Sequence, residues 1–172
     1  MASVFVSIGT NIHRYFHVKA ALDHLSETFG ALDISNVYES EAVGFEGDHF
    51  LNLVARFDTD MEVGRLSRWL KALEDQYGRC RNVEKFSART LDIDILTYDH
   101  LVGDIEGVEL PRDEIPKNAF VLLPLSEIAG DETHPAYDCN YRDMWLSYDA
   151  SSQKLWSVDF KWQGKTISSA EK

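Results

Sequence analysis

Cysteine is scarce in this sequence, because its 172 residues include only Cys80 and Cys139. Two cysteines cannot supply the disulfide framework of a small secreted domain, and no CxxC pair indicates a zinc site. Long apolar runs are missing too, since no segment approaches the roughly 20 apolar residues that a membrane-spanning helix needs. The opening residues, MASVFVSIG, lack a basic leader followed by a long apolar stretch. We therefore expect a reduced cytoplasmic protein with no membrane partner.

Positive charge is also in short supply. Lys and Arg total 17 against 29 Asp and Glu, so the formal net charge is −12. A chain this acidic is repelled by a nucleic-acid backbone unless its few cations are gathered in one place. Bulky core residues are plentiful, with four Trp, seven Tyr and nine Phe, and the length fits one domain over residues 1–172. We expect a globular domain with no nucleic-acid partner.

The first half of the chain alternates between strand-like and helix-like apolar patterns. Residues 4–8 form a β-branched and aromatic run, which predicts a strand that stops at a turn-like Gly-Thr-Asn cluster. Apolar residues at helical spacing predict a helix over residues 18–29, and Gly30 is placed to end it. Residues 32–38 have the composition of a second strand, and residues 39–49 that of a loop.

The same alternation continues further along the chain. Residues 50–57 alternate between two faces, which predicts a strand, and residues 63–77 carry a clear helical stripe. Residues 78–88 have no apolar period and are rich in cations. Strict alternation returns at residues 91–96, where every second side chain is aliphatic.

Taken in order, these elements read β-α-β-β-α-β. That order is the split βαβ, ferredoxin-like arrangement, an α/β (α+β) fold whose antiparallel sheet carries both helices on one face. Three further elements follow: a helix over residues 121–129 despite Pro124, a helix over residues 140–148 and a strand over residues 155–162. We expect these C-terminal helices and strands to extend the core by covering the other face of the sheet.

Asp92 and Asp94 are the sharpest chemical feature. Residues i and i+2 of a strand point the same way, so the two carboxylates project side by side from one face. Adjacent carboxylates repel each other, and the usual remedy is a hard cation such as Mg²⁺, which prefers one or two carboxylates together with phosphate oxygens. The alternative interpretation is an exposed strand face on which acidic and aliphatic residues simply alternate.

A positive island directly precedes these aspartates. Arg79, Arg81, Lys85 and Arg89 fall within eleven residues, opposed there only by Glu84. The alternative is a solvated charge run in a polar loop. Cations beside a carboxylate-bound metal are, however, what a triphosphate requires, because the metal bridges phosphoryl oxygens and arginines neutralise the remaining charge. The combination indicates phosphate chemistry.

The string KFSARTLDIDIL, residues 85–96, resembles the signature of the 6-hydroxymethyl-7,8-dihydropterin pyrophosphokinase family, in which a basic residue and a small-residue pair precede R-x-x-D-x-D. The resemblance extends over about residues 3–130 and leaves residues 131–172 as an addition. Four more segments match in order: SIGTN at 7–11, FLN at 50–52, Glu74 followed by GRCR at 78–81, and FVLLPL at 120–125.

The resemblance implies an activity in folate biosynthesis and a set of site residues. Family members transfer the β,γ-diphosphoryl unit of ATP to the hydroxymethyl oxygen of the reduced pterin and release AMP. Asp92 and Asp94 would hold two Mg²⁺ ions. The resemblance implies further catalytic residues in Arg79, Arg81 and Arg89, ATP contacts in Lys71, Glu74, Lys85, Ile95 and Arg112, and pterin contacts in Ser40, Val43, Phe50, Asn52 and Phe120. We expect these two small molecules as partners of a monomer or weak homodimer.

Several positions depart from the family pattern. Ser87 stands where the family has a flexible glycine, and Phe86 where tryptophan is common. The loop at residues 40–44 lacks its usual proline. Arg112 stands where the family has a phosphate-contacting histidine, and Lys71 replaces a polar amide. These changes remove neither a metal ligand nor a pterin aromatic, so they indicate a divergent member.

Three other functions remain open on the sequence alone. The same departures fit a pterin- or nucleotide-binding paralogue that lacks the transfer activity. A nucleotidyltransferase or cyclase would share the two-aspartate logic, but the sequence has no GGDEF-like turn or third acidic ligand. An RNA-binding ferredoxin-like module needs a basic sheet with stacking aromatics, which the charge of −12 disfavours.

Overall fold

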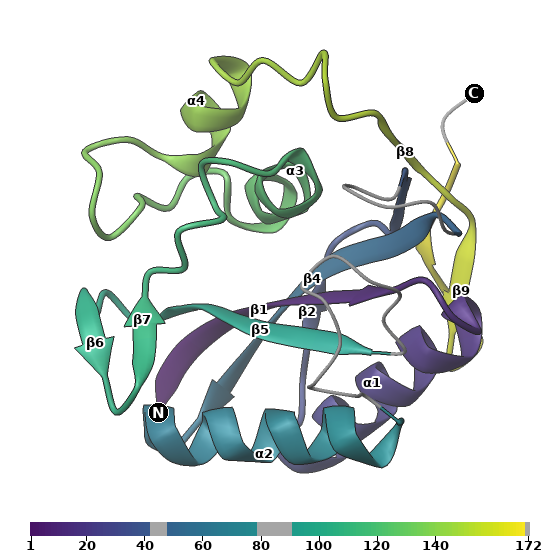
Figure 1. Cartoon of the computed structure of the whole chain (residues 1–172), viewed down its shortest axis with the longest axis horizontal. Coiled ribbons are helices and arrows are strands. Elements are labelled where there is room, and N and C mark those ends of the chain that lie inside the picture. Colours follow the sequence, from purple (N-terminus) through teal and green to yellow (C-terminus); the bar gives the residue numbers. More distant parts are fainter. Residues whose placement is uncertain (42–47, 79–90, 171–172) are drawn as a thin grey trace.

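The computed structural model describes residues 1–41, 48–78 and 91–170. The described part forms one six-stranded sheet with helices on both faces and two small hairpins beside it (Figure 1). The predicted elements at 4–8, 18–29, 50–57, 63–77 and 91–96 are all present. A helix that is both long and apolar enough to cross a lipid bilayer is not found in these described residues.

The sheet has the predicted antiparallel, ferredoxin-like order. Its main strands are β1 (Ala2–Thr10), β4 (Phe50–Thr59) and β5 (Asp92–Tyr98), and β1 lies between the other two. The β1–β4 register runs from Ala2 opposite Thr59 to Thr10 opposite Leu51. The sheet therefore holds the N-terminal end of β5 close to the C-terminal end of β1, where the site lies.

The strand predicted over residues 32–38 is wrong as one element. It is divided into β2 (Asp33–Ile34) and β3 (Tyr38–Ser40), both paired with β4. Between them the hydroxyl of Ser35 accepts a hydrogen bond from the backbone N–H of Val54 at 2.9 Å, and the Ser35 N–H donates to the Val54 carbonyl. Because the Ser35 hydroxyl, and not a backbone carbonyl, accepts the Val54 N–H, the regular strand pairing is interrupted there.

Helices α1 (Arg14–Phe29) and α2 (Val63–Gln76) cover one face of the sheet, as predicted (Figure 1). Their apolar stripes meet the inward residues of β1, β4 and β5 in one core. Phe29 and Phe57 stack there with ring centroids 4.2 Å apart. The fully buried side chains of this core include Leu22, Leu25, Leu51, Leu53, Leu66, Leu70 and Leu91.

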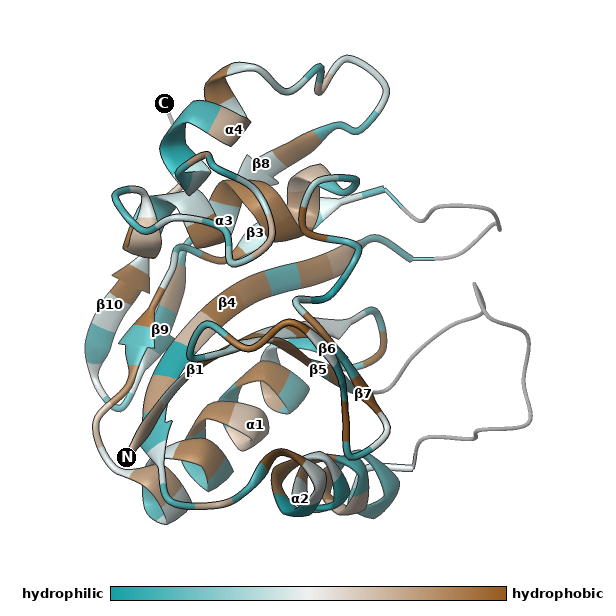
Figure 2. Cartoon of the chain, turned by 90° about the vertical axis from the view of Figure 1, so that its left-hand side faces the viewer, coloured by the Kyte–Doolittle hydropathy of each residue, from teal (hydrophilic) through white to brown (hydrophobic). Residues whose placement is uncertain are grey.

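A second apolar core lies on the other face, beneath α3 (Ala119–Ala129) and α4 (Tyr141–Leu146). Figure 2 shows how strongly apolar residues predominate in α3 and β4. Pro124 lies inside α3 without ending it, as predicted. The α4 helix begins after Asn140, whose side chain accepts from the Asp143 N–H at 2.8 Å. These two helices cover the face that the sequence assigned to them.

The strand predicted over residues 155–162 is also two elements. β8 (Leu155–Ser157) pairs with β3, and β9 (Phe160–Trp162) forms a hairpin with β10 (Lys165–Ser168). The hairpin packs against α1, where Phe160 stacks on Tyr15 at 5.2 Å and Trp162 donates from Nε1 to Asp23 at 2.8 Å. The expectation that every C-terminal element covers the other face is therefore wrong for this hairpin.

A hairpin that the sequence analysis missed links β5 to α3. Its strands are β6 (Gly103–Ile105) and β7 (Val108–Leu110), joined by Glu106 and Gly107, which have φ values of 53° and 87°. Positive φ at both central residues gives the twist that two-residue hairpin turns favour. The Gly64 N–H at the start of α2 donates to Oε2 of Glu106 at 2.9 Å. This bond fixes the hairpin beside the site.

Candidate active site

The two aspartates lie at the beginning of β5, where that strand pairs with the end of β1. Asp92 lies opposite Gly9, and Asp94 lies opposite Ser7. Both aspartates are partly exposed, whereas Ile93 beside them is buried in the core. The alternation predicted from the sequence thus presents two neighbouring carboxylates on one side of the strand.

These carboxylates line a cavity of about 320 Å³ between β5, α2 and β7. Four residues that the resemblance assigned to ATP also line it: Lys71, Glu74, Ile95 and Arg112. Lys71 is exposed on α2, while Ile95 is 5% exposed and belongs mainly to the core. The structure therefore brings together the predicted metal pair and four of the five predicted ATP contacts.

The surroundings of Asp94 disfavour the negative charge of its carboxyl group. Burial, followed by the charge of Asp92, raises the pKa of Asp94 to about 7, and Glu114 and Glu74 act in the same direction. Arg112 opposes them, with Nη2 3.5 Å from Oδ2 of Asp94. Excess negative charge in a partly buried place attracts a cation.

Glu74 is a buried carboxylate between α2 and β5. It is 3% exposed, and its Oε2 accepts a hydrogen bond from the backbone N–H of Ile93 at 2.8 Å. Ile93 lies between the two aspartates in the sequence, so this bond fixes the backbone of β5 between them. Glu74 thus has a structural role in addition to its place in the cavity wall.

The donor set suits Mg²⁺ better than a transition metal. Among residues 1–41, 48–78 and 91–170, no cluster of three or more His, Cys, Asp or Glu side chains is arranged to hold a metal. Mg²⁺ differs from zinc in this respect, because it commonly uses one or two carboxylates and takes its other ligands from phosphate and water. Asp92 and Asp94 fit that requirement.

Two predicted pterin residues are joined directly. The carboxamide of Asn52, 7% exposed, donates from Nδ2 to the hydroxyl of Ser40 at 2.9 Å. Across the sheet, a Cβ atom at Gly9 would lie 3.0 Å from Oδ1 of Asn52. The glycine therefore leaves the space in which the Asn52 amide is held.

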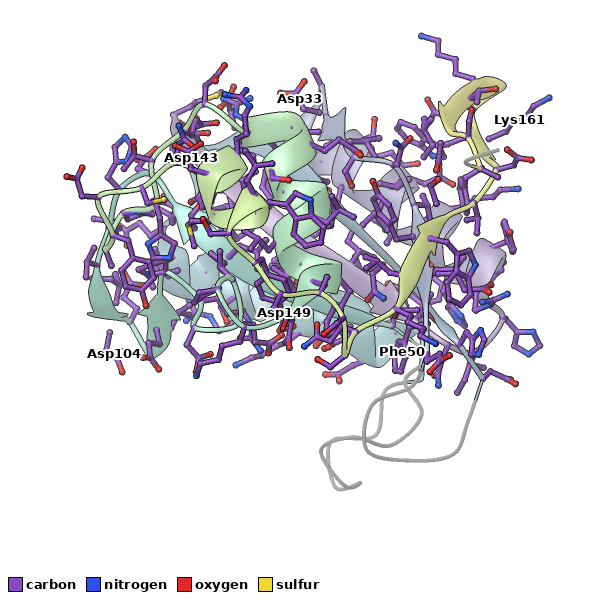
Figure 3. The ribbon with its side chains drawn as sticks, turned by 90° about the horizontal axis from the view of Figure 1, so that it is seen from above. Asp33, Phe50, Asp104, Asp143, Asp149 and Lys161 are labelled. Carbon is purple, nitrogen blue, oxygen red and sulfur yellow. The ribbon has the colours of Figure 1, made fainter. Side chains whose placement is uncertain are left out.

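The predicted pterin aromatics lie on different elements, and each is close to Ser40. Phe120 lies in the first turn of α3 and lines a cavity of about 190 Å³ together with Ser40. Phe50 begins β4 directly opposite Ser40 in the ladder, and Figure 3 places it near the start of β8. Phe50 does not line this cavity, so Ser40 is the residue that connects the two aromatics.

Five predicted site residues fall outside the residues that the structure describes. These are the four cations and one pterin contact, namely Arg79, Arg81, Lys85, Arg89 and Val43. Their assignment remains a prediction.

Sequence reasoning missed two residues that position the site. Gln153 accepts from the Ala119 N–H at 2.6 Å through Oε1 and donates from Nε2 to the Lys117 carbonyl at 3.1 Å. It thereby caps the helix that carries Phe120, whose own N-cap residue forms no side-chain cap. Glu114 accepts from Nη2 of Arg112 at 2.8 Å. The Gln153 contact spans 34 residues, so no local period in the sequence marks it, whereas Glu114 lies only two residues after Arg112.

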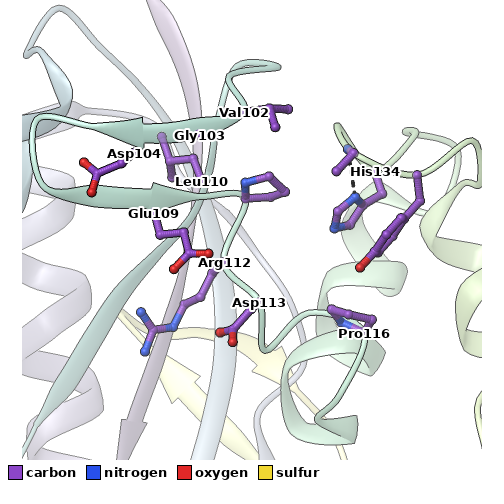
Figure 4. A pocket seen from close by; sticks show the side chains of 12 residues that line it. Val102, Gly103, Asp104, Glu109, Leu110, Arg112, Asp113, Pro116 and His134 are labelled. Carbon is purple, nitrogen blue, oxygen red and sulfur yellow. Dashed lines mark hydrogen bonds between the residues drawn. The ribbon is translucent and has the colours of Figure 1, made fainter.

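A second cavity, of about 390 Å³, adjoins the aspartate site on the far side of β7. The two cavities share Glu109, Arg112 and Asp113 in their walls. Figure 4 shows that His134 faces the end of β7 across this space, while the guanidinium of Arg112 turns away from His134. The Arg112 side chain therefore belongs to the aspartate side of the wall.

Solved structures with the same fold come from larger chains. The crystal structure of Plasmodium falciparum HPPK-DHPS with pteroate matches with a TM-score of 0.65 at 13% identity and covers 86% of this chain but 42% of that chain. An HPPK-DHPS crystallised in complex with substrates gives a TM-score of 0.67 at 13% identity, covering 98% and 50%. This chain spans half or less of these two proteins, and the likeness shows the fold.

Sequence relatives identify the family. A 2-amino-4-hydroxy-6-hydroxymethyldihydropteridine pyrophosphokinase of Aquifex aeolicus is 34% identical over 139 residues, covering 80% of this chain and 86% of the relative. The protein of that name from Bacillus subtilis is 30% identical over 128 residues, covering 72% and 76%. The family model described as 7,8-dihydro-6-hydroxymethylpterin-pyrophosphokinase matches residues 5–130. The resemblance found in the sequence is confirmed, and this chain belongs to the 7,8-dihydro-6-hydroxymethylpterin-pyrophosphokinase family.

Proposed function

We propose that this chain transfers diphosphate from ATP to 6-hydroxymethyl-7,8-dihydropterin. The hydroxymethyl oxygen forms a bond to the β-phosphorus, the bond from that phosphorus to the bridging oxygen of AMP breaks, and the hydroxyl proton passes to solvent. The observation that carries the proposal is the pair Asp92 and Asp94 on the wall of a 320 Å³ cavity, together with Lys71 and Arg112. Family membership supports the same reaction.

In this proposal Asp92 and Asp94 hold Mg²⁺, with two ions in the complete complex. When bound, the metal screens phosphate charge and polarises the β-phosphorus toward attack. The two carboxylates supply the negative charge that draws the cations into the site. Glu74 keeps the two carboxylates in place through its bond to the Ile93 N–H.

Cationic side chains align the triphosphate. Lys71 and Arg112 approach the cavity from α2 and from the segment after β7. The sequence adds Arg79, Arg81 and Arg89 as catalytic phosphate contacts, with Lys85 beside them. In-line phosphoryl transfer depends mainly on such positioning and charge neutralisation, so several cations share the task.

The pterin is held at the adjoining Ser40–Asn52 pair. The Asn52 amide offers a donor and an acceptor to the edge of the heterocycle, while its bond to Ser40 fixes its orientation. Phe50 and Phe120 supply flat apolar faces for the ring. Val43 completes this set of pterin contacts.

The proposal also covers the setting of the enzyme. It acts in the cytoplasm on two small molecules, as a monomer or weak homodimer, without a nucleic-acid or membrane partner. Residues 1–172 act as one domain, and the segment 131–172 contributes through Gln153, which caps α3.

The decisive experiment is an AMP-release assay with ATP, Mg²⁺ and 6-hydroxymethyl-7,8-dihydropterin. The wild-type protein should form AMP only when all three are present. Asp92→Ala should lower the rate at least a hundredfold, whereas Asp60→Ala, an exposed aspartate after β4, should keep it. Calorimetric binding of both ligands by folded wild-type protein with no AMP formed would instead establish a binding paralogue.

A further inference from the structure

Arg112 contacts two carboxylates with the same nitrogen. Its Nη2 lies 3.5 Å from Oδ2 of Asp94 and 2.8 Å from Oε1 of Glu114. The side chain of Arg112 is 35% exposed, and that of Asp94 is 25% exposed. The pair is therefore partly shielded from water, and its charges act on each other more strongly than a fully exposed pair would.

The remaining donors of Arg112 are placed for a second role. Its Nε is buried and has no hydrogen-bond partner within the part of the chain that the structure describes. The backbone N–H of Arg112 donates to the Leu96 carbonyl at 2.8 Å, so the residue is anchored to β5 while its guanidinium contacts Asp94 and Glu114. An unpaired N–H next to a cation site suits an anionic ligand.

We propose that Arg112 is the internal counter-ion of Asp94 in the ligand-free protein, and that Glu114 is the positioning residue that retains Arg112 when a divalent cation displaces it. The inference rests on the proposed function, which makes Asp94 a cation ligand. It adds a competition that the family resemblance does not contain, and it gives Glu114 a role.

The geometry permits Arg112 to move from Asp94 to Glu114. A cation that binds Asp92 and Asp94 meets the positive charge of Arg112 at close range, so the guanidinium must withdraw from Asp94. Glu114 already accepts the shorter of the two contacts, so Arg112 can withdraw from Asp94 and keep its contact with Glu114. The same movement leaves the Nε donor available for the phosphate that arrives with the metal.

Cation binding without nucleotide tests the proposal directly. Free Mn²⁺ is measured by electron paramagnetic resonance during titration of the nucleotide-free protein, with Mn²⁺ as the probe for the divalent site. Arg112→Gln should bind Mn²⁺ about tenfold more tightly than wild type, because a close positive charge is removed. Arg112→Lys keeps the charge and should stay near the wild-type affinity. Equal or weaker binding by the glutamine variant overturns the proposal.

Lys117→Gln is the matched control for net charge. Lys117 pairs with Asp113 at 3.3 Å and is 67% exposed, and it is not among the charges that shift Asp94. Its loss changes the total charge as Arg112→Gln does, and it should leave Mn²⁺ affinity within about twofold of wild type. A similar tightening in both variants would mean that the general field of the protein, and not the Asp94 contact, governs the affinity.

A double-mutant cycle tests the part played by Glu114. Glu114→Gln should weaken Mn²⁺ binding when Arg112 is present, because Arg112 then loses its ion pair with Glu114 and stays at Asp94. The same change should have a much smaller effect in the Arg112→Gln background. Equal effects in both backgrounds overturn the positioning role.

The outcome is independent of catalysis. These titrations contain no ATP or pterin, so they can succeed in a protein that forms no AMP. If the wild-type protein forms AMP normally and Arg112→Gln binds Mn²⁺ with unchanged affinity, this inference is rejected while the proposed function stands.

Discussion

Glu74 accepts a hydrogen bond from the backbone N–H of Ile93 at 2.8 Å, and this bond joins α2 to the strand between the two aspartates. Glu74 is 3% exposed. A buried backbone donor needs a hydrogen-bond partner, and Glu74 supplies it to Ile93 from a different element. The Glu74 side chain therefore helps to hold β5 against α2.

Two replacements of Glu74 test the contribution of this hydrogen bond to stability. Glu74→Ala leaves the buried Ile93 N–H unpaired and should lower the free energy of unfolding by about 1–3 kcal/mol. Glu74→Gln keeps an acceptor and should cost less. Urea denaturation of the metal-free proteins measures both, with Glu27→Gln on the exposed side of α1 as the control. Equal losses in the two variants would contradict the hydrogen-bond explanation.

The raised pKa of Asp94 predicts that the stability of the folded protein depends on pH. Burial and the charge of Asp92 raise its pKa from 3.8 to about 7 in the folded protein. Between these two values the folded state holds a proton that the unfolded state has lost, so this group's stabilising contribution falls as the pH rises from about 4 to 7. The urea midpoint of the wild-type protein, measured in chelator, should fall relative to that of Asp94→Asn as the pH rises across this range. Asp94→Asn should lack that part of the slope.

The neighbouring aspartate offers a more direct measurement. Asp92→Asn removes the second-largest cause of the raised pKa of Asp94 and should lower that pKa toward its ordinary value. Carbon NMR of the Asp94 carboxyl group during a pH titration reads the change at one atom. An unchanged titration midpoint would show that the charge of Asp92 does not contribute to the raised pKa of Asp94.

Much of the framework was predictable because its signals are local. The alternation at residues 91–96 sets which side chains of β5 enter the core, and the helical stripe at residues 63–77 brings Lys71 and Glu74 to the same wall. A strict apolar period determines which face of a strand or helix is buried, and the buried faces determine how the sheet and its helices pack. The aspartate site is therefore readable from the sequence.

What escaped prediction depends on contacts across the chain. The hydroxyl of Ser35 takes a ladder position from Val54, and nothing in residues 32–38 signals that exchange. Gln153 caps a helix that begins 34 residues earlier. Only the β6–β7 hairpin carried a usable local signal, since Glu106-Gly107 between two short runs is a turn pair.

The cap supplied by Gln153 predicts a coupled loss of stability and substrate affinity. Gln153→Ala should cost about 1 kcal/mol of stability, as the loss of a helix N-cap does. Because Phe120 lies in the turn that is capped, KM for the pterin should rise while KM for ATP stays constant. Steady-state AMP formation and urea denaturation test this, with Thr166→Ala, at an exposed position of β10, as the control. A rise in KM for ATP alone would contradict the role.

The close approach at Gly9 predicts a selective defect. In Gly9→Ala the added Cβ would lie 3.0 Å from Oδ1 of Asn52, so the buried amide must shift while its bond to Ser40 resists. KM for the pterin should rise several-fold with little change in overall stability. Gly130→Ala is a poor control because its Cβ meets a backbone oxygen at 2.7 Å, so Ala20→Gly, on the separate element α1, serves as the control. An unaltered KM for the pterin would remove Asn52 from the binding site.

The pairing of β8 with β3 has a consequence for solubility. Tyr38, Glu39 and Ser40 pair with Ser157, Trp156 and Leu155, so β8 occupies the hydrogen-bonding edge that β3 would otherwise present to other molecules. Open strand edges template aggregation. The covering strand comes from outside the segment 5–130 that the family model matches. A chain shortened before Leu155 would keep both aspartates, yet it would make β3 the edge strand in place of β8 and leave the hydrogen-bonding groups of β3 open to self-association.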